Sequence, residues 1–414
     1  MRELVVITLV ALLGAWLPSI CDAQRANGVA VFTKDQWRQD LQYFARELPR
    51  RHANAFHSIT REQFERAVAD LDAAIPSLQD HEIIVRMLQI TASVGDAHTY
   101  VHLPDTFRRY PLALYWFGNE LRVIRAPADY TDAVGARVVK IGDLNIGDVQ
   151  KRLLSVISQA ENDWFILNNS PGYMSRPEVL QTLGVIRDVN HAAFTFENDK
   201  GEQFVRDVSA VTLTPTATLN WLSAAKGEPL FRQRPTEQFW FTYLPDPQTV
   251  YVNFKTYNSL SENTKKFFQL VDANPTKKLV IDMRQNTGGD YTKVREYLIP
   301  AIKQHSAINQ KGRLFVIVGR RTFSAAMNSA VDLKKETNAI LVGEPIGERP
   351  NSYQENDEMK LPNSGVLVSY STKYYKFLDE DVPAVMPDKR IDPTWTDYKA
   401  GRDAVMDWIL SENK

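Results

Sequence analysis

Ser324 stands at the junction between an apolar run and an alanine-rich segment. The run Leu314–Val318 predicts a buried strand, and the segment from Ala325 to Lys335 predicts a helix. A serine at such a junction lies beside the free backbone N–H groups of the helix start. A nucleophilic serine needs such donors for the oxyanion of its tetrahedral intermediate, whereas the simpler role for this residue is a helix cap.

Two further segments carry residues that could act with this serine. In the segment Gly95–Thr99 a predicted helix ends and a strand begins, and His98 there can titrate near neutral pH. In the segment Asp282–Asp290, Gly288 and Gly289 let backbone N–H groups approach a ligand closely. The glycine loop and the serine both follow predicted parallel strands, so both should lie at the carboxyl edge of one sheet. The loop lacks the lysine and the glycine spacing of a phosphate-binding loop.

The strands and helices that must position these residues indicate a mostly parallel α/β core. From Thr249 onward, short apolar strands alternate with helices, which is typical of βαβ crossovers. Val366–Tyr374 predicts an additional edge strand. We therefore assign residues 236–414 to an α/β catalytic core.

Two regions precede this core. Residues 24–104 predict a helical region, in which capping boxes at Thr33 and Thr60 open two helices and a third runs from His81 to Ser93. Residues 105–235 alternate apolar and polar positions, with hairpins predicted at Gly118-Asn119 and around Asp199-Lys200-Gly201 and a helix from Val149 to Gln159. The strand–turn–strand pattern of this second region predicts a PDZ-like accessory domain.

The first residues predict an exported protein. Residues 1–23 read as a signal peptide, with a basic residue, an apolar run and a cleavage site after Ala23. A retained membrane anchor is the alternative, although the run is short for a span. Cleavage would leave no membrane span and would remove Cys21, the only cysteine, so that no disulfide or thiolate chemistry remains. We expect a periplasmic or secreted location.

The balance of charge excludes some partners. The chain of 414 residues has 49 basic and 50 acidic residues, so nothing favours a nucleic-acid partner. Neither a cofactor nor a metal is predicted. His52 and His57 flank a predicted turn, but we see no acidic partner at ligand spacing in the sequence. The oligomeric state stays open.

Taken together, four motifs resemble the tail-specific (C-terminal-processing) serine peptidase family, in that family's order and roughly its spacing. They are Gly95-Asp96-Ala97-His98-Thr99, Ile281-Asp282-Met283-Arg284-Gln285-Asn286-Thr287-Gly288-Gly289, Arg321-Thr322-Phe323-Ser324-Ala325-Ala326 and Val342-Gly343-Glu344-Pro345. The resemblance covers most of the chain after the signal peptide. It implies a crotonase/ClpP-like core, Ser324 as the nucleophile, and an oxyanion hole from Ala325 and from Gly288 or Gly289.

The sequence departs from the best-known members of that family at the base. Those members use a lysine in a turn shortly after the Gly-Glu-Pro segment, and here the aligned position falls on or next to Arg349. Arginine stays protonated in proteins and cannot accept the serine proton. The resemblance therefore favours the tricorn-like branch, which uses histidine with a supporting glutamate, and His98 matches its histidine. For the carboxylate we favour Glu355, with Glu344 and Asp96 as alternatives.

The sequence thus predicts a serine peptidase that acts on peptides or unfolded protein, with His98 as general base for Ser324. Two alternatives remain. A non-catalytic binding module of the same fold would carry an apolar ligand, and a hydrolase of non-peptide esters would differ only in substrate. The Gly-x-Ser-x-Gly motif of α/β-hydrolases is missing, because Thr322 and Ala326 occupy its glycine positions.

Overall fold

Three helices begin the part of the chain that the computed structural model describes, which comprises residues 32–158, 161–212 and 220–412. They are α2 (Lys34–Arg51), α3 (Arg61–Ala74) and α4 (Asp80–Val94). α2 and α3 open with the predicted capping boxes at Thr33 and Thr60. α4 ends at Gly95, whose φ of 98° is left-handed and turns the chain out of the helix. The signal peptide predicted over residues 1–23 lies outside the described residues.

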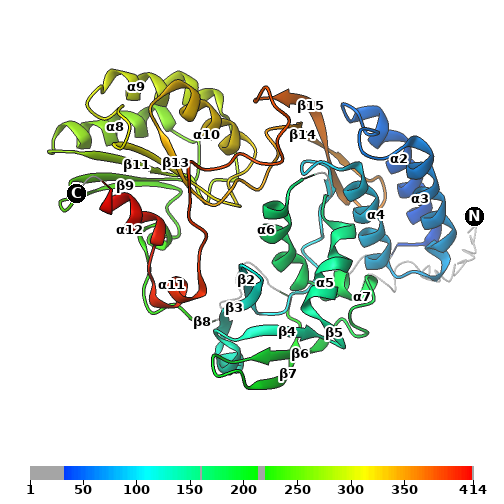
Figure 1. Cartoon of the computed structure of the whole chain (residues 1–414). Coiled ribbons are helices and arrows are strands. Elements are labelled where there is room, and N and C mark those ends of the chain that lie inside the picture. Colours follow the sequence, from blue (N-terminus) through cyan, green and yellow to red (C-terminus); the bar gives the residue numbers. More distant parts are fainter. Residues whose placement is uncertain (1–31, 159–160, 213–219, 413–414) are drawn as a thin grey trace, which may run out of the picture.

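The next region folds around an antiparallel sheet with the strand order β2-β3-β4-β6-β7 (Figure 1). The hairpins predicted at Gly118-Asn119 and around Asp199-Lys200-Gly201 are confirmed as β2–β3 and β6–β7. The predicted helix from Val149 is α5, but it ends at Leu153. The strands are β2 (Ala113–Phe117), β3 (Glu120–Pro127), β4 (Arg137–Ile141), β5 (Leu144–Asn145), β6 (His191–Glu197), β7 (Gln203–Ser209) and β8 (Trp221–Ser223), and the helices are α5 (Ile146–Leu153), α6 (Asp163–Met174) and α7 (Pro177–Thr182).

The C-terminal part of the chain contains a six-stranded sheet with the order β16-β13-β12-β11-β10-β9. β10 to β13 are mutually parallel and joined through helices, as the alternation of strands and helices predicted. Only β9 runs antiparallel. The strands are β9 (Phe239–Leu244), β10 (Thr249–Phe254), β11 (Lys278–Asp282), β12 (Leu314–Val318), β13 (Ile340–Gly343) and β16 (Lys389–Arg390).

Helices cover both faces of this sheet, because its central strands are apolar on both sides. Alternate residues of one strand enter different cores: Val250 and Val252 face one helical layer, and Tyr251 faces the other. The first layer contains α8 (Leu260–Asp272), α9 (Ile299–Gln304) and α10 (Ala325–Glu336). On the other face lies α12 (Ala404–Ser411), which follows α11 (Trp395–Ala400).

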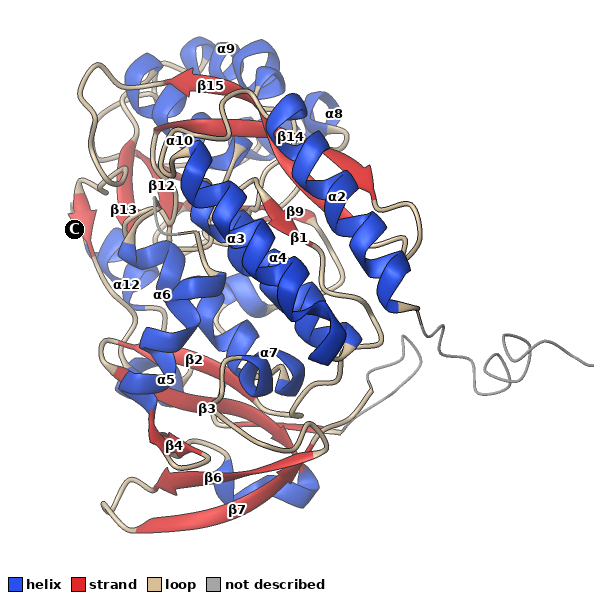
Figure 2. Ribbon diagram, turned by 90° about the vertical axis from the view of Figure 1, so that its right-hand side faces the viewer, coloured by secondary structure: helices blue, strands red, loops and turns tan. Residues whose placement is uncertain are grey.

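A third sheet pairs a strand that follows the N-terminal helices with two strands from the C-terminal part of the chain. The predicted strand Val366–Tyr374 exists as β15 (Leu367–Lys376), but its prediction as an edge strand of the main sheet is wrong. It pairs with β14 (Asn351–Lys360) and with the short β1 (Tyr100–Val101), which directly follows the predicted histidine segment. Figure 2 shows this long hairpin beside α2, and its apolar residues share one core with the N-terminal helices.

Within the described residues, no helix is long and apolar enough to cross a membrane.

Candidate active site

Ser324 lies in the loop between β12 and α10, directly before the first residue of the helix. Its hydroxyl makes no capping bond with the helix, so the simpler role considered for this residue is not the one it has. The backbone of Ser324 has φ 55° and ψ −128°, a conformation that a non-glycine residue adopts at a cost of about 1–3 kcal/mol. In this conformation the hydroxyl makes no bond to the helix N-terminus, so it is available for another partner.

That partner is His98. Its Nε2 lies 3.1 Å from Ser324 Oγ, although the two residues are 226 positions apart in the sequence. The imidazole is buried and stacks on the ring of Phe323, with 4.7 Å between ring centroids. Burial lowers the pKa of His98 to about 4, so that the ring is neutral at pH 7 and can accept a proton.

A buried carboxyl group, that of Glu348, lies on the other side of the imidazole. Its Oε1 is 3.7 Å from His98 Nδ1, and its Oε2 accepts the backbone N–H of Ser324. His98 Nδ1 and Glu348 Oε1 are both buried and have no hydrogen-bond partner among the described residues. A movement of less than about 1 Å would join these two atoms by a hydrogen bond.

Burial and the neighbouring Glu161 raise the pKa of Glu348 well above its usual range. Glu161 is itself buried, and burial raises its pKa to about 7. Its two oxygens accept the backbone N–H groups of Ala97 (3.2 Å) and Arg349 (2.9 Å). One carboxyl group therefore holds the loop that carries His98 to the turn that carries Glu348.

The structure does not bring Glu355, the favoured third residue, to His98. Glu355 lies on the exposed part of β14, where its carboxylate pairs with Lys373 (2.8 Å) and accepts the hydroxyl of Tyr375. Its place beside the imidazole is taken by Glu348, which the sequence analysis missed.

The other two carboxylates considered there do not reach His98 Nδ1 either. Glu344 pairs with Arg320 at 2.8 Å, and Asp96 Oδ1 accepts the backbone N–H of His98 at 3.2 Å. Arg349 stands next to Glu348, and its side chain contacts Asp381. Glu348 therefore lies in the same turn as the position that was compared with the lysine of the best-known family members.

A close backbone approach fixes that turn. A Cβ atom on Gly347 would lie 2.1 Å from the carbonyl oxygen of Arg320, so only glycine fits there. The contact brings the turn after β13 down onto the loop after β12, and Glu348 enters the interior between them.

The predicted oxyanion donors lie beside Ser324. Gly288 has a left-handed φ of 117°, and a Cβ there would lie 2.9 Å from the Cβ of Ser324. The N–H of Gly288 already donates to Asn286 Oδ1 at 2.9 Å. In the described chain, the N–H groups of Gly289 and Ala325 donate to no acceptor, so these two are the available donors.

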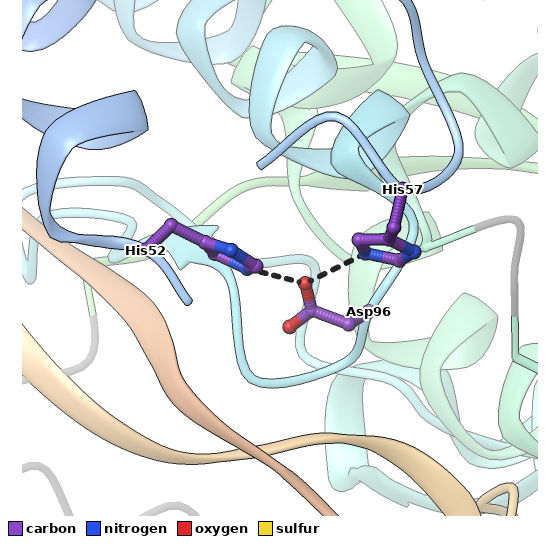
Figure 3. A group of neighbouring side chains, drawn as sticks. All are labelled: His52, His57 and Asp96. Carbon is purple, nitrogen blue, oxygen red and sulfur yellow. Dashed lines mark hydrogen bonds and ion pairs between the residues drawn. The ribbon is translucent and has the colours of Figure 1, made fainter. Parts of the chain in front are cut away.

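Figure 3 shows a second cluster, formed by His52, His57 and Asp96. The Nε2 atoms of the two histidines lie 2.9 and 3.5 Å from Asp96 Oδ2, so the acidic partner absent from the sequence pattern comes from a distant loop. His52 Nδ1 accepts the N–H of Asn54, so its Nε2 carries the ring proton and donates to Asp96 instead of offering a lone pair to a metal. The cluster is a hydrogen-bonded support for the loop.

A cavity of about 460 Å³ opens beside these groups. Its walls come from α4, α6 and the loops that carry the predicted nucleophile, base and glycine pair.

The described structure resembles solved structures of CPAF. Mature CPAF complexed with lactacystin matches with a TM-score of 0.62 and 12% identity over 91% of this chain and 97% of that chain. Mature CPAF alone matches with a TM-score of 0.62 and 11% identity, over 91% and 96% of the two chains.

The chain has the CPAF fold. No family model and no curated protein sequence matches it. At such low identity the likeness to CPAF establishes the fold, and the chemistry has to be argued from the residues of this chain. The mixed α/β architecture predicted from the sequence is confirmed by the CPAF fold, whereas its crotonase-like core and PDZ-like region stay predictions.

Proposed function

We propose that this chain is a serine peptidase of the tail-specific type, in which Ser324 attacks the peptide carbonyl and His98 accepts its proton. The observation that carries the proposal is the 3.1 Å contact between Ser324 Oγ and His98 Nε2. The carboxyl group of Glu348 behind the imidazole supports it, since an orienting acid completes the arrangement that serine hydrolases use. The CPAF fold agrees with the motif resemblance.

The mechanism follows from the positions of these groups. As Oγ bonds to the carbonyl carbon, its proton passes to His98 Nε2, and Glu348 stabilises the imidazolium through Nδ1–H. The N–H groups of Gly289 and Ala325 hold the oxyanion, and each such donor contributes roughly 100- to 1000-fold in rate. His98 then protonates the leaving amine, and a water molecule repeats the cycle on the acyl-enzyme.

The finer assignments belong to the same proposal. We assign the base to histidine, as in the tricorn-like branch, because an arginine side chain cannot accept the serine proton and that of Arg349 contacts Asp381. The crotonase-like core, the PDZ-like accessory region, export, and a peptide or unfolded protein substrate complete the proposal.

Labelling with a fluorophosphonate tests the nucleophile directly. We expect the wild type to be labelled at Ser324, and we expect Ser324→Ala and His98→Ala to abolish labelling. Ser411→Ala, which removes an exposed hydroxyl at the end of α12, is the matched control and should be labelled like the wild type.

The two alternatives give different results. A wild type that is not labelled but binds an apolar ligand tightly would be a binding module. A wild type that is labelled and hydrolyses esters but no peptide would be an ester hydrolase.

A further inference from the structure

The cavity beside the proposed catalytic groups is placed to receive part of the substrate. Four of its lining residues are immediate sequence neighbours of the proposed base, the nucleophile and the glycine pair. They are Ala97, Thr99, Thr287 and Phe323. A chain bound across Ser324 would therefore extend groups into this cavity, whose volume lies in the range of about 300–1,000 Å³ that is usual for ligand sites.

The cavity wall is polar and apolar in nearly equal parts, and apolar residues lie next to the nucleophile. α4 contributes Leu88, α6 contributes Phe165 and Tyr173, and Phe323 closes the side next to the nucleophile. This apolar part of the wall favours an aliphatic or aromatic side chain, because burial of apolar surface is the main source of affinity there.

Three charged residues also line the cavity, and among them only Arg321 is exposed. Asp96 is engaged by two histidines, and Arg320 is paired with Glu344. Arg321 is exposed and has no ion-pair partner within the ranges that the structure describes. The cavity therefore presents one free positive charge.

A second cation stands at the same edge of the sheet. Lys255 follows β10 at the same carboxyl edge of the sheet, and it too has no ion-pair partner in the described part of the chain. Burial lowers the pKa of Lys255, the negative charge of Asp282 raises it, and the positive charge of Arg321 lowers it.

We infer that the substrate carries a carboxylate that pairs with Arg321, next to an apolar side chain that occupies the cavity. This inference rests on the proposed function and names the substrate class of the same site. The carboxylate has two sources: an aspartate or glutamate side chain, or the free C-terminus of the substrate.

Internally quenched peptides that differ at one position test the inference. Each peptide carries a central apolar residue, flanked by glutamate, glutamine or lysine, with an amidated C-terminus. A fourth peptide carries glutamine and a free C-terminal carboxylate. The wild type should show a kcat/KM for the glutamate or the free-carboxylate peptide about fivefold above that for the lysine peptide, as expected for one exposed charge pair. Whichever of the two peptides is preferred identifies the source of the carboxylate.

Arg321→Glu should reverse the order of the acidic and lysine peptides, and high salt should reduce the preference of the wild type. Lys311→Glu is the matched control. It makes the same change of charge at an exposed position before β12, whereas Arg321 follows the opposite end of that strand. The ratio between acidic and lysine peptides should be the same in Lys311→Glu as in the wild type.

An unchanged ratio in Arg321→Glu would overturn the inference and leave the peptidase assignment intact. If no peptide is cleaved, the proposed function fails, and the inference is then decided by binding. Fluorescence anisotropy of the labelled peptides on Ser324→Ala, with and without Arg321→Glu, should show the same reversal. Equal binding of acidic and lysine peptides there would contradict it.

Discussion

The imidazole of His98 has two different neighbours, and each nitrogen has a separate task in the proposed reaction. Nε2 faces the hydroxyl of Ser324, and Nδ1 faces the carboxyl group of Glu348. A neutral ring must carry its proton on Nδ1 to leave Nε2 free to act as a base. The carboxylate selects that tautomer, which is why its identity matters as much as that of the base.

Glu348→Gln should therefore lower kcat strongly with little change in folding. An amide can donate to Nδ1 and so stabilise the wrong tautomer, and replacing the orienting carboxylate of a serine protease costs about 10⁴-fold. We expect a fall of roughly 10³- to 10⁴-fold, measured as kcat on a quenched peptide. Glu355→Gln is the matched control and should stay within about twofold, because its ion pair is on the surface. A larger loss in Glu355→Gln than in Glu348→Gln would refute the assignment.

At the scale of elements, three loops meet at the site, and a buried carboxyl group joins two of them. Glu161, just before α6, accepts N–H groups from the loop after α4 and from the turn after β13. The neighbouring Asn162 donates to the carbonyl groups of Ile346 and Pro383. The start of α6 thus positions the two loops that carry His98 and Glu348.

The negative charge of Glu161 should also affect the acid limb of the pH–rate profile, through the pKa of Glu348. The proposed reaction needs neutral His98 and ionised Glu348, so the pair must have lost both of its titratable protons, and the second of them comes from Glu348. Burial and the negative charge of Glu161 both raise the pKa of Glu348, so activity should fall with decreasing pH at a value above the ordinary value for glutamate.

Glu161→Gln removes that negative charge, so ionisation of Glu348 becomes easier and the acid limb should move to lower pH. The measurement is the pH dependence of kcat/KM for both proteins. A role limited to holding the loops would reduce the rate without moving the limb, and that result would contradict the electrostatic part of this prediction.

At the scale of the whole molecule, the site forms only because the C-terminal hairpin packs against the N-terminal helices. Ser371 on β15 is fully buried, and its hydroxyl donates to Asp96 Oδ1 at 2.5 Å. Its backbone N–H donates to Thr99 Oγ1, and its carbonyl accepts the N–H of Ala53. These bonds fix the His98 loop from the opposite end of the chain.

Ser371→Ala should destabilise the protein and also reduce kcat. Loss of this hydroxyl leaves a buried carboxylate with one donor fewer, which costs about 1–3 kcal/mol. We expect a lower urea midpoint and a fall in kcat that exceeds any rise in KM, because the base is displaced. Ser411→Ala, with an exposed hydroxyl, should change neither quantity. A Ser371→Ala protein with wild-type midpoint and kcat would show that the hairpin does not hold the loop.

The sequence by itself determined the features that local patterns encode. Capping boxes, apolar runs and glycine pairs depend on neighbouring residues, so the helices, the alternation in the core and the positions of Ser324 and His98 could be predicted. The presence of Arg349 at the compared position also excluded a lysine base from the sequence alone, because the residue type by itself shows that an arginine cannot accept a proton.

Only the tertiary structure decided which distant groups meet. Glu348 and Glu355 are both acidic residues in the same stretch, and nothing local distinguishes the buried one from the exposed one. The contact between Gly347 and the Arg320 carbonyl buries the first, and pairing with Lys373 keeps the second at the surface. Likewise β15 has the composition of a strand, but its pairing with β1 joins residues more than 260 positions apart. Pairing and burial depend on the packing of the whole chain, which short-range patterns do not contain.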